Sequence, residues 1–434
     1  MYPIGLDYVA GALADRHEVA ILDLNQEKGP GVLRTRIEEF APDIIGFSIR
    51  NVDNTDASNL HSFIAGYRQI VQEIRSSRKV PLVLGGSGFT IFPEVLMEAL
   101  DADFGIPGDG ELMGRLVDAL EDQSDPANIP GIIRKGFHAL SPPVQPDRSM
   151  RRYFDGSSAH VRFYLKRGGM LNIQTKRGCP FRCVYCTYPH IDGRHLRFID
   201  PDDVAKTAIM LQAAGAKYLF ITDSTFNCSI PHSIDVAKAF IKAGLSIPWG
   251  AFFAPLDVPP DYYHIMADSG LTHIEFGTES LADKVLAAYG KPFKKDEIFR
   301  AHRLALDAGL RVAHYLMPGG PGEDERTLEE TLAGVEQLER TVLFFFCGVR
   351  IYPHTALYDI ALREGQISPG QDLLEPVFYR SGGLSSDRIE KKLTEHAAGR
   401  PHWVIGSGGD KTAKVISRMY ARGHYGPLWE HLIP

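Results

Sequence analysis

The chain contains the stretch Gly178-Cys179-Pro180-Phe181-Arg182-Cys183-Val184-Tyr185-Cys186, three cysteines spaced C-x3-C-x2-C shortly after the strand-like run 171–175. Three thiolates on so short a loop can occupy three corners of one iron–sulfur cube and leave its fourth iron open to another ligand. Zinc or unliganded thiols are the alternatives, but zinc sites usually add a second Cys or His pair, and none follows here. Five cysteines in 434 residues are also too few for a disulfide framework. The stretch therefore predicts an iron–sulfur cluster.

This spacing, with the aromatic Tyr185 just before the third cysteine, resembles the signature of the radical S-adenosylmethionine (radical SAM) superfamily. The resemblance implies a [4Fe–4S] cluster on Cys179, Cys183 and Cys186, whose open iron is chelated by the amino and carboxylate groups of SAM. One electron from the cluster then cleaves the sulfonium and gives a 5′-deoxyadenosyl radical. The protein holds the cofactors, excludes water and aims the reacting atom.

The overall composition fits a soluble globular protein of two or three domains, with 44% hydrophobic and 23% charged residues. The formal net charge of −7 gives no global attraction to nucleic acid or to anionic membranes. No secretory signal opens the chain, and no apolar run approaches the roughly 20 residues of a membrane span. We therefore expect a cytoplasmic protein with no nucleic-acid partner and no membrane span.

Residues 1–120 alternate short apolar runs with helical periodicity, which predicts a doubly wound, Rossmann-like α/β domain. We expect strands at 18–24, 43–50, 81–84 and 103–106, and helices at 5–13, 32–40, 60–74, 92–100 and up to 120. Ligands of such sheets bind outside the carboxyl ends of the strands. Glycine-rich turns there are equally explained as tight strand–helix connections. The candidate binding residues at these ends are Ser48, Ile49, Arg50, Gly85, Gly86, Ser87 and Gly108.

A second strand–helix series occupies residues 169–370. We expect strands at 171–175, 218–222, 249–253, 273–277, 311–317 and 343–352. Six units are too few for a closed eight-stranded barrel, and the resemblance implies a partial (β/α)6 barrel instead. Residues 121–168 are expected to connect the two domains. Residues 371–434 are expected to form a mostly helical extension, with helices at 387–398 and 412–422 and a last stretch that packs on the barrel or covers its open side.

Polar residues and glycines follow the carboxyl ends of the barrel strands, where active-site residues of such folds lie. The resemblance implies that some bind the methionyl, ribose and adenine parts of SAM. Structural roles stay open for several: turn capping for Asp223 and Ser224, a helix-dipole partner for Glu279 and a buried ion pair for Arg350. The residues expected to contact SAM are Tyr185, Asp223, Ser224, Glu279, Ser280, Gly319, Gly320 and Arg350.

A doubly wound domain ahead of such a barrel resembles the cobalamin-binding (B12) class of radical SAM enzymes. The match rests on residues 2–8, 85–89 and 108–111, and it spans about residues 1–365 together with the barrel. The chain begins at the first helix, so the first strand of such a domain is missing or lies upstream. Cobalamin domains with a histidine ligand carry Asp-x-His-x-x-Gly. The stretch around His17 lacks the glycine and lies at a helix end, so we expect no protein imidazole on cobalt.

The resemblance implies a cobalamin-dependent radical SAM methyltransferase, which uses SAM and methylcobalamin to methylate an unactivated carbon of a lipid, natural-product or peptide substrate. A one-electron donor such as flavodoxin or ferredoxin is implied as its partner. One rival is a radical SAM enzyme that keeps the domain without using cobalamin and performs dehydration, epimerisation or cyclisation. Another is a non-catalytic iron–sulfur protein. Bound corrinoid and SAM cleavage separate the three.

Overall fold

The computed structural model describes residues 2–26, 29, 31–136, 150–406 and 409–434. Its first domain is built on a four-stranded sheet in the order β1 (Ile45–Ser48), β2 (Leu82–Gly85), β3 (Phe104–Ile106) and β4 (Ile133–Arg134). The pairings β1–β2 and β2–β3 are parallel, and the edge pairing β3–β4 is antiparallel. Three of the four strands predicted for this domain are thus confirmed, each slightly shifted or shortened.

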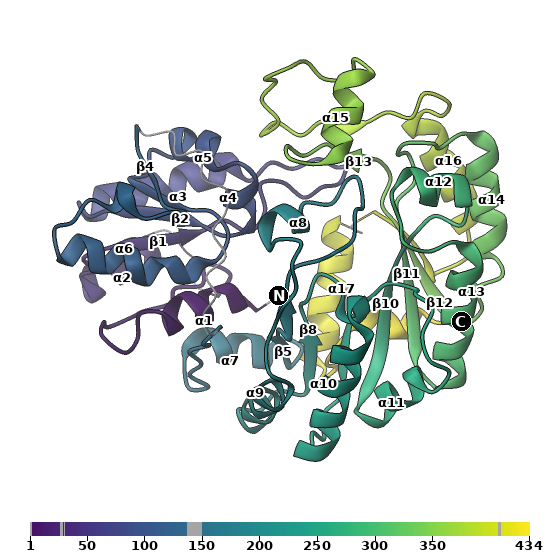
Figure 1. The fold of residues 1–434 in the computed structure, drawn as a ribbon, viewed down its shortest axis with the longest axis horizontal. Helices are drawn as coiled ribbons and strands as arrows, with labels where there is room; N and C mark the ends of the chain where they lie inside the picture. The colour runs from purple at the N-terminus through teal and green to yellow at the C-terminus, as the bar shows by residue number, and fades with distance from the viewer. Residues whose placement is uncertain (1, 27–28, 30, 137–149, 407–408) are drawn as a thin grey trace.

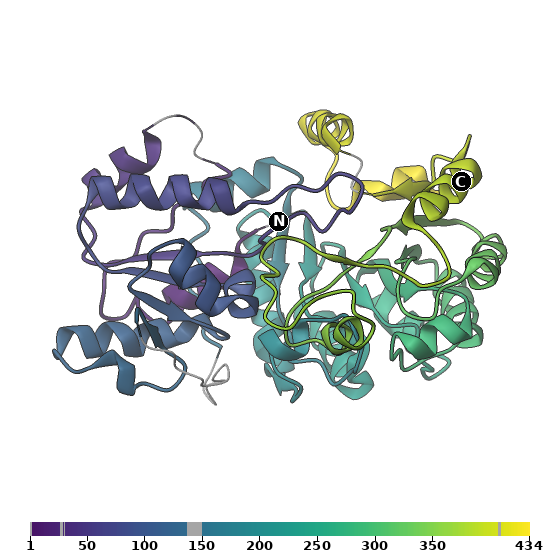
Figure 2. The same ribbon diagram turned by 90° about the horizontal axis from the view of Figure 1, so that it is seen from above.

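Helices cover both faces of this sheet, because side chains along a strand alternate between its faces. Leu82 and Leu84 of β2 pack with residues of α2, α3 and α5, whereas Val83 packs with residues of α1 and α6. Figures 1 and 2 show the sheet between these two helical layers. The doubly wound prediction is therefore confirmed. The helices of this domain are α1 (Ile4–Gly11), α2 (Val32–Phe40), α3 (Ile64–Ser77), α4 (Ser87–Ile91), α5 (Pro93–Ala99) and α6 (Met113–Glu121).

The strand predicted at residues 18–24 is wrong: the described structure has no regular element there. The end of this segment is held by side chains. The buried carboxylate of Asp23 accepts hydrogen bonds from the Tyr164 hydroxyl at 2.7 Å and from the Asn25 amide at 2.8 Å. Tyr164 belongs to α7 (Ala159–Lys166), which packs against the second domain. The segment therefore lies against α7.

The second domain is built on seven parallel strands in the order β15-β12-β11-β10-β9-β8-β5. They form the curved, open barrel in the right half of Figure 1. Six of them confirm the predicted series. The seventh, β15, has three residues inside the predicted helical extension, too few to show a periodicity. The strands are β5 (Met170–Ile173), β8 (Tyr218–Ile221), β9 (Trp249–Phe253), β10 (Leu271–Glu279), β11 (Arg311–Leu316), β12 (Thr341–Phe345) and β15 (Trp403–Ile405).

The core of this domain lies between the strands and an outer layer of helices. Buried residues of α9, α10, α11 and α13 cluster with those of the central strands, and α14 packs with β12. The carboxyl ends of the strands stay free of this layer and are available for a site. The helices are α9 (Pro201–Ala213), α10 (Ile230–Ala243), α11 (Tyr262–Asp268), α12 (Asp283–Ala288), α13 (Lys295–Asp307) and α14 (Glu325–Val335).

The sixth predicted strand, 343–352, is two strands in the structure. After β12 the chain turns at Gly348, which has a φ of +84° and donates its backbone N–H to the carbonyl of Pro318 at 2.9 Å. The next residues form β13 (Val349–Arg350), which pairs with β14 (Phe378–Tyr379) in an antiparallel two-stranded sheet. The break follows from Gly348, because glycine adopts positive φ without strain.

The carboxyl-terminal region adds α15 (Ala356–Arg363), α16 (Ser386–Ala397), α17 (Gly409–Ala421) and a final turn at Leu428–Leu432. The indole N–H of Trp429 donates to the Glu275 carboxylate on β10 at 3.0 Å. The last residues thus pack on the barrel, which is one of the two alternatives expected for this stretch. No helix in the described ranges is long and apolar enough to cross a membrane.

Residues 121–168 contribute to both domains. They supply β4 to the first sheet and α7 to the flank of the second. The proposed boundaries at residues 120, 168 and 370 stay predictions.

Candidate active site

The cysteine loop is held at its base by a short hairpin, β6 (Lys176–Arg177) with β7 (Arg197–Phe198). Gly178 opens the loop with a φ of +95°, and a Cβ there would lie 2.2 Å from the carbonyl oxygen of His195. Only glycine fits this position. The short helix α8 (Tyr188–Ile191) closes the loop, and in Figure 1 it lies between the two domains.

The three cysteines of this loop are free thiols in the described structure. Burial raises the pKa of Cys179 and Cys183, and it raises the pKa of Cys186 to about 12. The pKa of Cys179 also responds to the charge of Cys183, and the pKa of Cys186 responds to the charges of Cys183 and Cys179, so the three sulfurs lie close together. Iron ligation supplies the positive charge that buried thiolates lack. This donor set fits a three-cysteine [4Fe–4S] cluster.

A buried ion pair supports the start of the loop. The Lys176 ammonium lies 2.7 Å from the Asp223 carboxylate, and both side chains are 1% exposed. Asp223 also accepts the Thr175 N–H at 2.8 Å and the Thr175 hydroxyl at 2.6 Å. Both carboxylate oxygens are thus used by the protein, which speaks against Asp223 as a ligand of the SAM amino group. Its neighbour differs, because the Ser224 hydroxyl is buried and has no hydrogen-bond partner among the residues that the structure describes.

A second charged group lies beside the loop, at the carboxyl end of β10. The Tyr185 hydroxyl donates to Glu279 Oε1 at 2.7 Å, and the Lys291 ammonium donates to the same oxygen at 3.0 Å. Glu279 has a φ of +64°, and the register of β10 with β11 shifts just before it. Non-glycine residues held at positive φ concentrate at functional sites. The strand end therefore presents Glu279 and Tyr185 next to the three thiols.

The glycine pair after β11 packs against an aromatic side chain. A Cβ on Gly320 would lie 2.4 Å from the Tyr289 hydroxyl oxygen, which accepts the Gly320 N–H at 3.1 Å. Gly319 donates its N–H to the Glu323 carboxylate at 3.2 Å, and burial raises the pKa of Glu323 to about 7. These contacts within the protein explain both glycines, and a role beside the adenine of SAM stays a prediction.

Two further residues that were predicted to contact SAM bond to other groups of the protein. Arg350 is buried and donates to Asp53 at 2.7 Å and to the carbonyls of Ile351 and Leu373, both at 2.8 Å. The structure thus favours the buried ion pair left open from the sequence over a SAM carboxylate. The Ser280 hydroxyl lies 2.8 Å from the Thr331 hydroxyl and is fully buried. Both side chains are thus engaged within the protein, and a contact of either with SAM stays a prediction.

In the first domain, the loops after β1 and β2 pack backbone against backbone. The N–H of Gly88 donates to the carbonyl of Ile49 at 2.9 Å, and the Ser87 hydroxyl donates to the carbonyl of Arg50 at 2.9 Å. Gly86 has a φ of +96°, and a Cβ there would lie 2.6 Å from the Ile49 oxygen. Ser48 and Arg50 are exposed at this edge. This edge is formed mainly by backbone and carries few side chains. A large flat ligand such as a corrin ring fits such a surface.

The third loop at that edge, which follows β3, is joined to the second domain by ion pairs. Gly108 donates its N–H to the Thr90 hydroxyl at 2.8 Å. The next residue, Asp109, forms ion pairs with Arg197 and, at 3.0 Å, with Arg177, both on the hairpin that carries the cysteines. Arg177 also pairs with Glu111 at 2.8 Å. The carboxyl edge of the first sheet is therefore fixed beside the cysteine loop.

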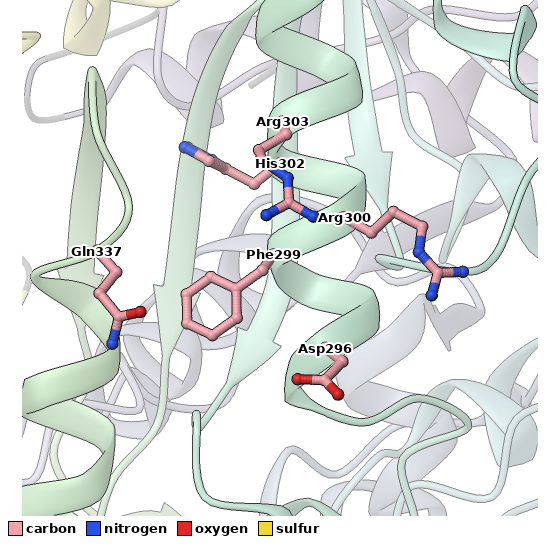
Figure 3. A pocket seen from close by; sticks show the side chains of 6 residues that line it. All are labelled: Asp296, Phe299, Arg300, His302, Arg303 and Gln337. Carbon is pink, nitrogen blue, oxygen red and sulfur yellow. The ribbon is translucent and has the colours of Figure 1, made fainter.

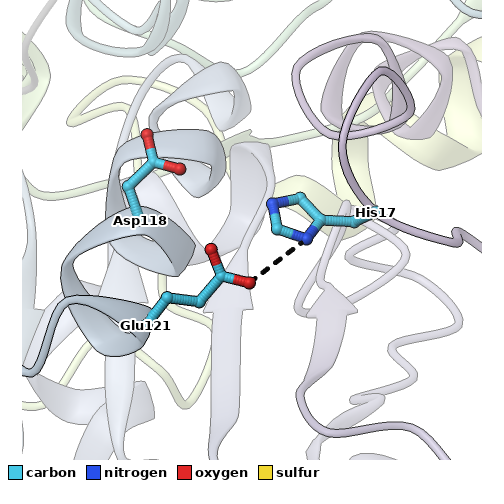
Figure 4. Close-up of side chains that lie close together, drawn as sticks. All are labelled: His17, Asp118 and Glu121. Atoms are coloured by element: carbon cyan, nitrogen blue, oxygen red, sulfur yellow. Dashed lines mark ion pairs between the residues drawn. The ribbon is translucent and has the colours of Figure 1, made fainter.

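His17 lies away from this edge. Figure 4 shows it beside Asp118 and Glu121 of α6, with His17 Nδ1 3.6 Å from a Glu121 oxygen. Because α6 follows β3 and runs back along the sheet, its end lies near the amino ends of the strands. Arg16 already pairs with Asp118 at 2.5 Å. This position agrees with the expectation that His17 is no cobalt ligand.

A cavity of about 280 Å³ lies on the outer surface of α13, lined by Asp296, Phe299, Arg300, His302, Arg303 and Gln337 (Figure 3). Arg300 points toward Asp257 and pairs with it at 2.8 Å. The cavity is on the helical side of the barrel, away from the strand ends, and plays no part in the site.

The buried cationic residues of the site were not identified from the sequence. Lys176, Arg177 and Lys291 are at most 8% exposed. Lysine and arginine are rarely buried unless they are paired. Their partners Asp223, Asp109 and Glu279 are distant in sequence, and no local pattern could have found the pairs.

Known proteins share this arrangement. Two family models match the chain: the radical SAM superfamily over residues 173–334 and the B12 binding domain over residues 1–117. Tryptophan 2-C-methyltransferase of Streptomyces laurentii is 23% identical over 425 residues, covering 82% of this chain and 71% of that protein. An uncharacterized methyltransferase of Pyrococcus horikoshii is 26% identical over 371 residues, covering 83% of this chain and 78% of that protein.

Among solved structures, TsrM of Kitasatospora setae with cobalamin and a [4Fe–4S] cluster bound superposes with a TM-score of 0.88 at 24% identity, covering 100% of this chain and 94% of that chain. A three-cysteine loop on an open barrel, preceded by a doubly wound domain, defines an iron–sulfur enzyme of the radical SAM type. The chain thus carries a radical SAM domain over residues 173–334, and a B12 binding domain over residues 1–117 precedes it.

Proposed function

We propose that the chain is a cobalamin-dependent radical SAM methyltransferase that places a methyl group on an unactivated carbon of a small molecule. The observation that carries the proposal is the ion-pair cluster of Asp109 and Glu111 with Arg177 and Arg197. It holds the edge predicted to bind cobalamin beside the loop predicted to bind the cluster. A methyl carrier and a radical generator need this proximity, because both act on one substrate atom.

The residues proposed to hold the cofactors come from both domains. Cys179, Cys183 and Cys186 would ligate the cluster, and SAM would lie beside Tyr185, Ser224, Glu279 and Gly319–Gly320. Cobalamin would rest on Ser48–Arg50, Gly85–Ser87 and Gly108. When bound, the cluster and SAM supply a hydrogen-abstracting radical, and cobalamin supplies a methyl carrier. The chain itself positions these groups and excludes water.

The substrate class is proposed from the relatives. The Streptomyces laurentii enzyme is named for tryptophan, and a TsrM structure contains tryptophan as substrate. A small molecule is therefore favoured over a lipid or a peptide. We also propose a one-electron donor such as flavodoxin or ferredoxin, and a cytoplasmic location.

The test is anaerobic reconstitution with iron, sulfide and hydroxocobalamin, followed by product analysis with SAM and dithionite. We expect 5′-deoxyadenosine, and S-adenosylhomocysteine that forms only when hydroxocobalamin is supplied. Formation of 5′-deoxyadenosine alone, with no corrinoid retained, would contradict the methyltransferase and favour the rival that does not use cobalamin.

A further inference from the structure

Lys291 is a buried cation that the proposed chemistry does not yet use. Its side chain is 7% exposed, and its ammonium contacts Glu279 Oε1 at 3.0 Å and the Tyr185 hydroxyl at 3.1 Å. Tyr185 lies between Cys183 and Cys186 in the sequence. The ammonium is therefore held at the side of the loop where the two thiols lie.

The backbone fixes Lys291 in this place. The N–H of Val184, inside the cysteine loop, donates to the carbonyl of Tyr289 at 2.9 Å. Gly290 has a φ of +70°, and a Cβ there would lie 2.5 Å from the carbonyl oxygen of Arg182. Residues 289–291 thus pack directly on residues 182–184, and glycine is required for that contact.

The ammonium lies beside the cysteine loop. It donates to the hydroxyl of Tyr185, and the two residues before it pack on residues 182–184 of the loop. Its positive charge is therefore held next to the proposed cluster site, and Glu279, the carboxylate with which it pairs, supplies the opposing charge.

We propose that Lys291 is a positioning residue that raises the reduction potential of the cluster by holding a positive charge beside the cysteine loop. Reduction adds one negative charge to the cluster, and a nearby cation stabilises the reduced form. Cluster potentials depend on net charge and on hydrogen bonds to the sulfurs. The inference rests on the proposed function only in that a cluster must be present.

The test is a redox titration of the reconstituted enzyme without SAM, followed by electron paramagnetic resonance. In Lys291→Met, the ratio of reduced to oxidised cluster at a fixed potential should fall on the order of tenfold, which is a shift of 59 mV for a one-electron couple. Lys291→Arg should restore the wild-type midpoint. Glu279→Gln removes the opposing charge and should shift the midpoint to more positive values.

The matched control is Lys295→Met, which breaks a partly exposed pair with Glu330 at the start of α13 and should leave the midpoint unchanged. Iron counts accompany every variant. A wild-type midpoint in iron-loaded Lys291→Met would overturn the inference, and a merely structural role predicts that result. If Lys291→Met binds no iron, the midpoint of Glu279→Gln provides the test. A shift to more positive values supports the inference, and an unchanged or more negative midpoint overturns it. Wild-type enzyme that holds no iron would instead contradict the proposed function.

Discussion

The cysteine loop and the carboxyl edge of the first sheet lie side by side but are built differently. Buried charged side chains surround the cysteine loop, among them the pairs Lys176–Asp223 and Lys291–Glu279. The first-domain edge is built from backbone contacts, in which Gly86 packs against the carbonyl of Ile49. The three cysteines leave a readable pattern in the sequence, but the buried charged pairs around them do not, because their partners are distant in the chain. A site built from backbone leaves only glycines, which many turns share.

The same difference predicts how each region fails. Removing a side chain from the cysteine loop should affect iron, and adding one at the glycine edge should affect the corrinoid. The ion pairs of Asp109 join the two regions, but the ligands proposed for the two cofactors are separate. The following variants test whether the two kinds of damage can be separated.

The largest expected effect comes from Cys183→Ala. The variant removes one of three proposed iron ligands, and we expect cleavage of SAM to fall by more than about 100-fold, beyond the effect of losing an outer contact of a metal site. Anaerobic assay of 5′-deoxyadenosine measures it. Cys347→Ala, a half-buried cysteine outside the loop, is the control and should cleave SAM normally. Cleavage of SAM by Cys183→Ala at the wild-type rate would contradict the assignment of Cys183 as a cluster ligand.

Asp223→Asn tests the charged support of the loop. It leaves Lys176 buried without its counter-charge, which we expect to cost about 3–5 kcal/mol of unfolding free energy. The control is Asp202→Asn, whose pair with Lys242 is exposed and worth less than about 1 kcal/mol. Thermal denaturation compares the two variants. Equal melting temperatures would show that the buried pair does not support the barrel.

Gly86→Ala tests the glycine edge. The added Cβ meets the Ile49 carbonyl at positive φ, which we expect to cost about 1–3 kcal/mol and to weaken corrinoid binding. Iron content should not change. In Gly66→Ala on α3 nothing lies within 4 Å of the added Cβ, and we expect stabilisation by about 0.5–1 kcal/mol. Unchanged corrinoid affinity in Gly86→Ala would place the corrinoid elsewhere.

The smallest expected effect is a pH dependence of stability at the loop of Gly319 and Gly320, where Glu323 accepts the Gly319 N–H. Burial raises the pKa of Glu323 from 4.5 to about 7, so the folded chain binds a proton more tightly than the unfolded chain. The resulting stability is complete below pH 4.5 and is lost as the pH rises through about 7. Glu323→Gln should flatten the melting temperature between these values. An equally steep curve in the variant would contradict the assignment.

The sequence predicted what depends on local pattern. Six barrel strands and the three clustered cysteines were found because apolar runs and ligand spacing are local. Asp223 and Ser280 follow β8 and β10 as expected, whereas Arg350 lies in the separate strand β13, and all three side chains bond to residues distant in sequence. Lys291 was missed for the same reason. The strand expected at 18–24 is absent, and Asp23 near the end of that segment bonds to Tyr164 of α7, a contact that no local pattern shows.

The central claim is that one chain holds a cluster and a corrinoid in two separable sites beside each other. Iron and corrinoid counts after a single anaerobic reconstitution of wild type, Cys183→Ala and Gly86→Ala test it most directly. We predict about four irons and about one corrinoid per wild-type chain, corrinoid without a full cluster in Cys183→Ala, and a full cluster with less corrinoid in Gly86→Ala. Wild-type chain without corrinoid, or loss of both groups in each variant, would contradict the claim.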